Sequence, residues 1–453
     1  MQKKFLIREA EIINEGKIIT GHVLVEDGKI SEIIPAGPDD IPDQFLKDAI
    51  VIPAKGKFLL PGVIDDQVHF REPGLTHKGD ICTESRAAVA GGVTSYMDMP
   101  NTSPKATTIE LLEQKYHIAS KKSLANYSFF LGATNENIEE IESADPAKIC
   151  GIKVFMGAST GNMLVDEPGT LEKIFERSRL IIAIHSEDEK IIRENLSHFS
   201  EQYGENIPID AHPLIRSEEA CYVSTAKAIA LALRFNTRLH ILHLSTEKEL
   251  ELLDNSRPVE KKKITGEVCI HHLWFDERDY HQRGTLIKWN PAIKKESDKK
   301  ALFKGLLDNK IDIIATDHAP HTLEEKQNPY GSCPSGAPMI QHSLVAMLEF
   351  YHRGMISPEQ IVNKMCHSPA LLYRIKNRGF IRKGYYADLV IVDPGSPWTV
   401  NKNNLLYKCG WSPMEGIQFN SAVTHTFVNG CLVYENGEPD DSIRGMRLEF
   451  QPS

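Results

Sequence analysis

Five side chains that can bind a metal ion stand at or close to the ends of short apolar stretches. They are His69, Lys153, His185, His243 and Asp317. Imidazole and carboxylate groups hold Zn²⁺ while leaving one coordination position open for water, which a catalytic zinc site requires. Each residue alone would more commonly have a structural role, but together they predict a catalytic zinc site.

Lys153 is the unusual member of this set, because an ammonium group repels a metal ion. Burial lowers the pKa of a lysine and leaves part of it neutral. A neutral amine can add CO₂ and become a carbamate, which is an anionic bidentate ligand. Lys153 is therefore either a metal ligand in the form of a carbamate or, without that modification, a salt-bridge partner.

The apolar stretches that carry these residues alternate with segments of helical periodicity. Eight buried-type β runs follow one another, at 59–70, 93–99, 127–133, 149–156, 180–185, 239–244, 264–273 and 311–316. Helical candidates lie at 83–90, 109–120, 187–203, 218–235, 246–253 and 298–307. Alternating strands and helices predict an α/β fold with a parallel sheet, and eight units predict a closed (β/α)₈ barrel like that of triosephosphate isomerase. Such barrels carry their active sites at the C-terminal ends of the strands, where the five residues fall.

The two ends of the chain share a different pattern. Short alternating apolar stretches are broken there by turns such as Asp27-Gly28 and Asn429-Gly430, which is typical of β-hairpins. We expect residues 1–55 and 380–453 to build one small composite β-sandwich domain, and residues 56–379 to form the barrel.

The composition is that of an ordinary globular protein. Of the 453 residues, 41% are hydrophobic and 25% are charged, which argues against a disordered, fibrous or membrane protein. With 52 Lys+Arg against 62 Asp+Glu, the net charge is −10. No overall field therefore attracts nucleic acid or an anionic membrane, and an anionic substrate must be bound by local cations.

Cysteine usage and apolar run lengths bear on the cellular compartment. The eight cysteines include no CxxC pair, which argues against a disulfide framework. No apolar run has the form of a signal peptide or reaches the roughly 18 residues of a membrane span. These features predict a cytoplasmic protein.

Two longer motifs indicate a family. Residues 61–74 read PGVIDDQVHFREPG and residues 315–321 read ATDHAPH. Between them lie MPNT at 99–102, GIK at 151–153, IHSE at 184–187 and HILHLST at 240–246. This series resembles the cyclic amidohydrolases, and most closely the dihydroorotase family, over about residues 51–393.

The resemblance implies one or two Zn²⁺ held by the five residues named above, with Lys153 as a carbamate. It implies that Arg71, Asn101 and His321 bind a substrate carboxylate, with Asn290 near the substrate ring. Arg71 also suits this role independently, because a guanidinium binds a carboxylate bidentately. The alternative for Arg71 is an ion pair with Glu72 or Glu84.

The implied reaction is the reversible hydrolysis of the cyclic amide of dihydroorotate to N-carbamoyl-aspartate, which runs toward ring closure in pyrimidine biosynthesis. Asp317 would take the proton of the attacking water and return it to the leaving ring nitrogen. The expected partner is a small-molecule substrate, with no nucleic acid or membrane, and we expect a homo-oligomer, either a dimer or a tetramer.

The sequence departs from the family's first motif at Gln67, where relatives have histidine. Residues 65, 67 and 69 share one face of a strand, so Gln67 points toward the site, but an amide oxygen is a weaker Zn²⁺ ligand than imidazole. One metal position could therefore be weak, water-filled or absent. A lesser departure is Lys294, where relatives usually have arginine.

Three further histidines invite a metal role. In a strand, alternation would place His271 and His272 on opposite faces, so at most one would face the barrel interior, and we expect structural roles for both. His240 is an odd number of residues from His243 and should lie on the other side of its strand.

Two stretches, 283–297 and 322–338, are predicted to be loops over the site. The second is rich in Gly and Pro, which favours a long irregular loop, either a moving lid or a static wall.

Two other functions remain open. The first is a cyclic amidase of the hydantoinase, dihydropyrimidinase or allantoinase type, whose substrates generally lack a ring carboxylate. The second, suggested by Gln67, is a catalytically silent homologue that serves as a scaffold.

Overall fold

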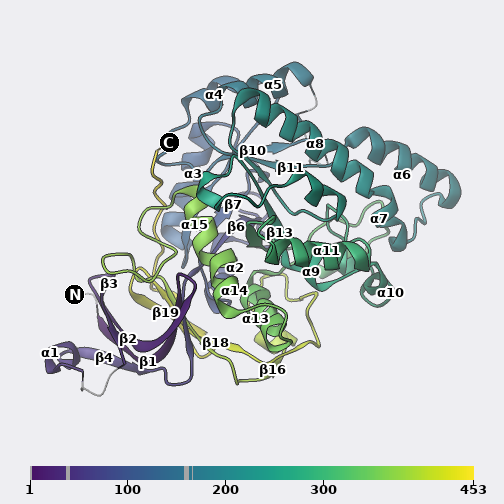
Figure 1. Cartoon of the computed structure of the whole chain (residues 1–453). Coiled ribbons are helices and arrows are strands. Elements are labelled where there is room, and N and C mark those ends of the chain that lie inside the picture. Colours follow the sequence, from purple (N-terminus) through teal and green to yellow (C-terminus); the bar gives the residue numbers. More distant parts are fainter. Residues whose placement is uncertain (1–2, 37–40, 158–162, 166, 453) are drawn as a thin grey trace.

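A ring of parallel strands forms the centre of the molecule in the computed structural model, which describes residues 3–36, 41–157, 163–165 and 167–452 (Figure 1). One three-stranded sheet has the order β6 (Val63–Val68), β7 (Val93–Asp98), β8 (Asn126–Phe129). A six-stranded sheet continues with β9 (Leu131–Gly132), β10 (Ile152–Phe155), β11 (Ile182–His185), β12 (Leu239–Ile241), β13 (Ile264–Cys269) and β14 (Ile313–Ala315). All neighbouring strands in both sheets are parallel.

The two parallel sheets meet at both ends. Phe130 alone separates β8 from β9. At the other end, Val68 of β6 forms a parallel bridge with His318, just after β14. The backbone N–H of His69 donates to the carbonyl oxygen of His318 at 2.7 Å. The strand order therefore closes on itself.

Helices follow most strands and pack around the ring (Figure 1). They include α2 (Ile81–Ala90), α3 (Ile109–Lys122), α4 (Ile138–Ser143), α5 (Pro168–Arg177), α6 (Glu189–Tyr203), α8 (Glu218–Phe235), α11 (Glu296–Leu307), α13 (Ser343–His352), α14 (Pro358–Val362) and α15 (Ser368–Tyr373). Side-chain caps define several of their starts: Asp80 caps α2, Thr108 caps α3 and Ser217 caps α8. Such residues accept hydrogen bonds from N–H groups that have no partner in the first helical turn.

Each predicted β run contains an observed strand, but the first run divides in two. Residues Phe58–Pro61 form β5, which pairs antiparallel with β15 (Leu389–Asp393) in a different sheet, while β6 starts the ring. The break lies at Gly62, where an added Cβ would come within 2.0 Å of Thr94 Oγ1. Because Thr94 on β7 packs so closely against residue 62, only glycine fits at this position.

Two other predicted segments end or fold differently. The run 264–273 leaves the strand at Cys269, and its last residues form the short helix α9 (Ile270–Trp274). The argument from strand alternation for His271 and His272 was therefore wrong. The helical candidate 246–253 is only a 3₁₀ segment, η2 (Lys248–Leu252). Apolar runs this short do not distinguish helix from strand by periodicity.

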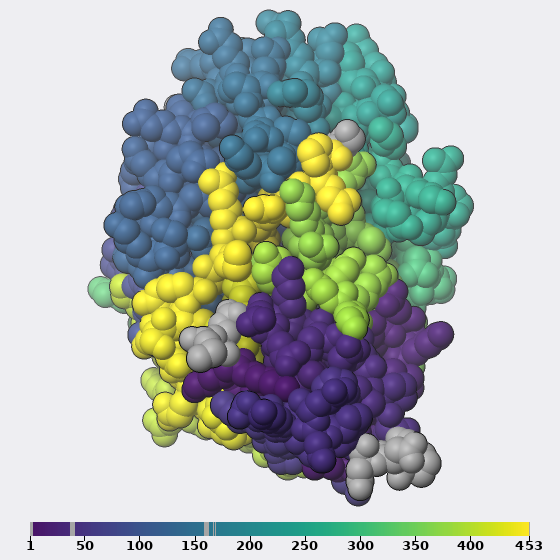
Figure 2. Space-filling model, turned by 90° about the vertical axis from the view of Figure 1, so that its left-hand side faces the viewer, coloured from purple at the N-terminus to yellow at the C-terminus, as the bar shows by residue number. Residues whose placement is uncertain are grey.

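Strands from both chain ends form one nine-stranded sheet. Its order is β20 (Glu438–Pro439), β19 (Cys431–Glu435), β18 (Ala422–Val428), β15, β5, β1 (Lys4–Asn14), β2 (Lys17–Glu26) and β3 (Lys29–Pro35), with β4 (Ala49–Pro53) beside β1. Figure 2 shows the purple N-terminal and yellow C-terminal segments packed together on one face. A separate pair joins β16 (Trp398–Thr399) to β17 (Gln418–Phe419).

In the part of the chain that the structure describes, no helix is both long and apolar enough to cross a membrane.

Candidate active site

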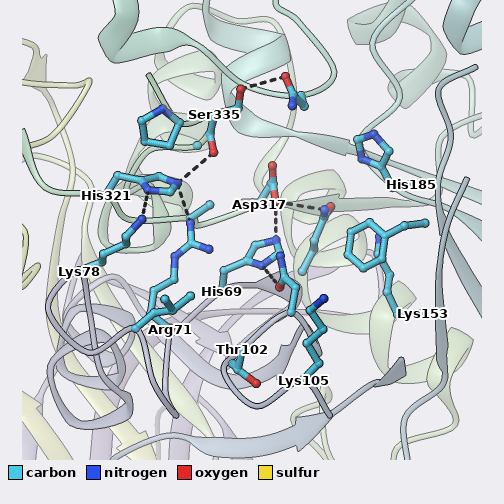
Figure 3. Close-up of a pocket in the computed structure, with 18 of the residues that line it drawn as sticks. His69, Arg71, Lys78, Thr102, Lys105, Lys153, His185, Asp317, His321 and Ser335 are labelled. Carbon is cyan, nitrogen blue, oxygen red and sulfur yellow. Dashed lines mark hydrogen bonds and ion pairs between the residues drawn. The ribbon is translucent and has the colours of Figure 1, made fainter. Parts of the chain in front are cut away.

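One pocket of about 530 Å³ gathers the residues that the sequence analysis singled out. It opens at the C-terminal ends of the ring strands, and its lining includes Gln67, His69, Arg71, Asn101, Lys153, His185, His243, Asn290, Asp317 and His321. Figure 3 shows Arg71, Lys78 and His321 on one side and His185 with Lys153 on the other, while His69 and Asp317 lie between them. The pocket thus has a cationic side and a metal-ligand side.

The first pair of ligand-type groups is His69 and Asp317. His69 Nε2 lies 3.2 Å from Asp317 Oδ1, and His69 Nδ1 donates to Asn101 Oδ1 at 2.8 Å. A histidine that donates through one ring nitrogen presents the other as a ligand. Gln67 Nε2 donates to the same Asp317 oxygen at 3.2 Å.

The second pair is His185 and His243, whose Nδ1 and Nε2 atoms lie 3.0 Å apart. His185 Nε2 donates to Glu187 Oε2 at 2.8 Å, and Arg216 pairs with the same carboxylate. Burial by itself would raise the pKa of Glu187, but Arg216 and His185 together lower it to about 2. The ionised Glu187 therefore orients His185 so that Nδ1 faces the pocket.

Both imidazoles of this second pair are neutral near pH 7. Burial lowers the pKa of His185. Burial, together with His185 and Lys153, keeps the pKa of His243 well below its usual value. Neutral imidazole is the form that binds metal.

Lys153 lies on β10 with only 1% of its surface exposed. Its Nζ is 4.7 Å from the centre of the Phe155 ring, and no carboxylate among the described residues forms an ion pair with it. Burial lowers the pKa of Lys153 to about 7, although Asp317 and Glu267 oppose that shift. The salt-bridge alternative is thus unsupported by the described residues, and burial favours the neutral amine.

The cationic side of the pocket is built around His321. Arg71 Nη2 lies 3.0 Å from His321 Nε2, and Lys78 Nζ donates to His321 Nδ1 at 3.0 Å. Burial and these two cations keep the pKa of His321 well below its usual value, so the ring is neutral. Sequence analysis missed Lys78, which follows Arg71 in the same loop.

Arg71 has no carboxylate partner among the described residues, since its Nε donates to the carbonyl oxygen of Pro320 at 3.0 Å. The expected competitors are engaged elsewhere: Glu72 pairs with Lys122 and Glu84 with His318. Buried charges are normally paired. The unpaired guanidinium therefore favours an anionic ligand in the pocket.

Three of the pocket residues have a left-handed backbone. The φ angles are 68° at Arg71, 40° at His243 and 46° at Asp317. Such angles are strained for residues other than glycine and cluster at functional sites. The N–H of His243 donates to Glu267 Oε1 at 3.1 Å, which stabilises the backbone at His243.

A second polar cluster, which includes His240, lies inside the ring but does not line the pocket. The expectation that His240 would lie on the other side of its strand from His243 was wrong, because β12 ends at Ile241 and His243 follows it with a left-handed backbone. His240 Nε2 is 3.3 Å from Asp66 Oδ2 and 3.1 Å from Glu267 Oε2. Ligand-type atoms of these three residues all lie within 4.8 Å of one another. All three are fully buried. We call this group the sealed cluster.

The two predicted loop stretches form a wall of the pocket. The second contains the short helix α12 (Leu323–Lys326), and its residues Pro334, Ser335 and Gly336 line the pocket. Lys326 Nζ donates to the carbonyl oxygens of Lys288 and Pro334 at 3.2 and 2.9 Å. Lys288 Nζ donates in turn to the Tyr330 and Cys333 carbonyls. These bonds tie the two stretches together and favour the static wall.

Asn290, His271 and His272 complete the predicted set. Asn290 Oδ1 accepts from Ser335 Oγ at 2.9 Å at the pocket wall. His271 stacks on Trp289 with ring centres 4.1 Å apart, and His272 Nε2 donates to the Pro291 carbonyl at 3.2 Å. Neither histidine lines the pocket.

Residues 58–433 match the model of the amidohydrolase family. The chain belongs to this family. It is 34% identical to a dihydroorotase of Pyrococcus abyssi over 445 residues, or 98% of each chain. It is 33% identical to a dihydroorotase of Methanosarcina mazei over 426 residues, covering 91% of this chain and 90% of the other. The resemblance inferred from the motifs is confirmed.

Solved structures of other enzymes share the fold. An L-hydantoinase from Arthrobacter aurescens superposes with a TM-score of 0.90 at 26% identity, over 97% of this chain and 98% of that one. A dihydropyrimidinase from Brevibacillus agri gives 0.86 at 25% identity, over 96% of each chain. This family member therefore has the mixed α/β fold of these structures, which confirms the α/β part of the predicted fold class.

Proposed function

We propose that this amidohydrolase is a zinc-dependent dihydroorotase, which interconverts dihydroorotate and N-carbamoyl-aspartate and closes the ring in pyrimidine biosynthesis. One observation carries the proposal. The buried guanidinium of Arg71, which has no carboxylate partner in the described part of the chain, faces a set of neutral imidazole and carboxylate groups across one pocket. Dihydroorotate has both features that this arrangement requires, a ring carboxylate and a cyclic amide. The dihydroorotase relatives support the same substrate.

The proposal includes the architecture around the site. The closed strand order supports a (β/α)₈ barrel over residues 56–379, except that β5 (Phe58–Pro61) belongs to the terminal sheet. That shared sheet supports a composite β-sandwich domain from 1–55 and 380–453. We also propose a cytoplasmic location and a dimeric or tetrameric assembly.

The residues present fit Zn²⁺. With bonds of about 2.0–2.1 Å, tetrahedral ligand atoms stand roughly 3.3 Å apart; the two ligand pairs, His69 with Asp317 and His185 with His243, are spaced 3.2 and 3.0 Å. Lys153, as a carbamate, would complete the set. Bound Zn²⁺ would supply a water of lowered pKa and polarise the amide carbonyl.

The chain's own residues orient the substrate and move the proton. Arg71, assisted by Asn101 and His321, would bind the ring carboxylate through charge-assisted hydrogen bonds. Asp317 would accept the proton of the attacking water and return it to the ring nitrogen as the amide bond breaks. In the closing direction Asp317 removes the proton from the attacking nitrogen instead.

The hydantoinase-type alternative has the support of the solved structures, but a ring without a carboxylate would leave the buried Arg71 with no carboxylate partner among the described residues. A silent scaffold is disfavoured because His69, Lys153, His185, His243 and Asp317 are all retained in one pocket.

Substrate comparison with an Arg71→Ala variant tests the proposal. The wild type should hydrolyse dihydroorotate, and Arg71→Ala should lower kcat/KM on it by about 10–100-fold, because a charged hydrogen bond contributes about 1.5–3 kcal/mol. Arg86→Ala, which removes an ion pair with Asp441 outside the pocket, should leave it unchanged. Turnover of hydantoin or dihydrouracil in place of dihydroorotate would establish the alternative, and no turnover of any cyclic amide by zinc-loaded protein would establish the scaffold.

A further inference from the structure

Gln67 lies beside the pair formed by His69 and Asp317. It lies on β6, is 1% exposed and lines the pocket. Its side chain makes two contacts: Nε2 donates to Asp317 Oδ1 at 3.2 Å, and Oε1 accepts from the Cys269 thiol at 3.7 Å. These partners orient the amide, because a carboxylate accepts hydrogen bonds and the thiol donates one.

The orientation of this amide bears on the His69 and Asp317 pair. Asp317 Oδ1, which faces His69 Nε2, is the same oxygen that accepts from Gln67. A cation between His69 and Asp317 would meet the amide hydrogens of Gln67, the positive end of its dipole. Turning the amide to present Oε1 would break both hydrogen bonds and would offer only a weak ligand.

The His185 and His243 pair has no such obstacle among the described residues. Glu187 holds the outer nitrogen of His185. The outer nitrogen of His243, Nδ1, is buried without a hydrogen bond in the described part of the chain. Each ring therefore presents one nitrogen to the pocket, and Lys153 stands on the neighbouring strand β10. Three ligands with a fourth position open describe a catalytic zinc site.

We propose that this chain binds a single Zn²⁺, at His185, His243 and carbamylated Lys153, and that the Gln67 amide takes the place of a second ion beside His69 and Asp317. The proposal rests on the proposed function and refines its zinc site. Gln67 is then a positioning residue, which holds the Asp317 carboxylate by an N–H hydrogen bond instead of a metal bond. His69, held by Asn101, is the other partner of that carboxylate.

Zinc stoichiometry tests the inference without relying on activity. Purified protein is stripped of metal, reloaded with excess Zn²⁺ and bicarbonate, desalted and analysed by mass spectrometry for zinc per chain. Wild type should retain one zinc and Gln67→His two, because imidazole supplies the missing ligand. Gln67→Leu, which has neither an N–H donor nor a ligand atom, should retain one. Gln202→His, on the exposed face of α6, controls for a histidine added elsewhere and should also retain one.

Three other outcomes of these measurements would each overturn a specific part of the proposal. Two zinc ions in active wild type would overturn the single-ion inference and leave the proposed function standing. No zinc and no turnover would overturn the proposed function itself. One zinc in a folded Gln67→His variant, verified by its unfolding midpoint, would show that Gln67 does not determine the stoichiometry.

Discussion

The pocket and the sealed cluster contain similar side chains but differ in what those side chains contact. Both lie inside the strand ring, and both combine histidine with carboxylates. In the sealed cluster, His240 Nε2 donates to Asp66 and Glu267, and its Nδ1 donates to Thr265 Oγ1 at 2.8 Å. Tyr373 donates to Asp66 at 2.9 Å. In the pocket, by contrast, imidazole nitrogens face an open cavity.

The protonation states differ in the same way. Burial disfavours a charged His240, but hydrogen bonds to its two carboxylates outweigh burial and raise the pKa of His240 to about 9. The pKa values of His185 and His243 are lowered instead. A proton thus already occupies the place where a metal would bind in the sealed cluster. Residue type alone does not define a metal site. The ligand atoms must also have lone pairs that carry no proton, and the ion must be able to reach them.

The largest effect is expected at Lys153. Lys153→Ala should lower turnover of dihydroorotate by more than about 10³-fold, because it removes the carbamate ligand itself. Loss of a residue that only contacts a metal ligand costs about 10–100-fold. A short carboxylic acid in the assay should restore part of the rate. Lys364→Met removes another buried lysine of lowered pKa that does not line the pocket, and this variant should retain activity. Full activity in Lys153→Ala would make Lys153 structural.

Removal of His240 should affect stability and leave zinc binding intact. His240→Gln leaves two buried carboxylates without their cationic partner, which costs about 3–5 kcal/mol in the free energy of unfolding. Urea unfolding at pH 6.5 measures the loss, and zinc content should match wild type. Loss of zinc with unchanged stability would mean that the sealed cluster, not the pocket, holds the metal.

The pH dependence of this effect follows from the raised pKa. His240 titrates near its ordinary value of 6.5 when unfolded and at about 9 when folded, so its stabilisation is complete below about pH 6.5 and is lost as the pH rises through 9. The difference in unfolding free energy between wild type and His240→Gln should therefore shrink as the pH rises from 6.5 to 9.5. A difference independent of pH would contradict a charged His240.

A smaller effect is expected at Glu187. Glu187→Gln keeps the shape of the side chain but removes the charge that orients His185, so zinc affinity should fall by about 10–100-fold. Competition with a chelator for Zn²⁺ measures this affinity. Glu249→Gln alters another buried glutamate, which contacts Thr225 and Thr246 outside the pocket, and should leave zinc affinity unchanged. Equal affinities in Glu187→Gln and wild type would make Glu187 irrelevant to the metal side.

Local patterns were sufficient to predict the parallel strands and the residues that they carry. His185 is the last residue of β11, and His69, His243 and Asp317 each follow a ring strand within two residues. Because parallel strands end at one edge, residues far apart in sequence meet there. The break at Gly62 and the helix α9 were not predictable, since packing against other elements determines both.

Contacts between distant segments account for what sequence analysis missed. Lys78 and His321 are 243 positions apart, and Gln67 and Asp317 are 250 apart. No local pattern indicates that Gln67 would donate to Asp317 or that Asp66 would face His240. Such pairs depend on how the ring closes.

Diffraction data collected at the zinc absorption edge would test the central claim most directly, on crystals of zinc-loaded protein with dihydroorotate. We predict an anomalous peak in the pocket at His185, His243 and Lys153, with the substrate carboxylate at Arg71. A peak in the sealed cluster, or a pocket without zinc in protein that turns over dihydroorotate, would contradict the account.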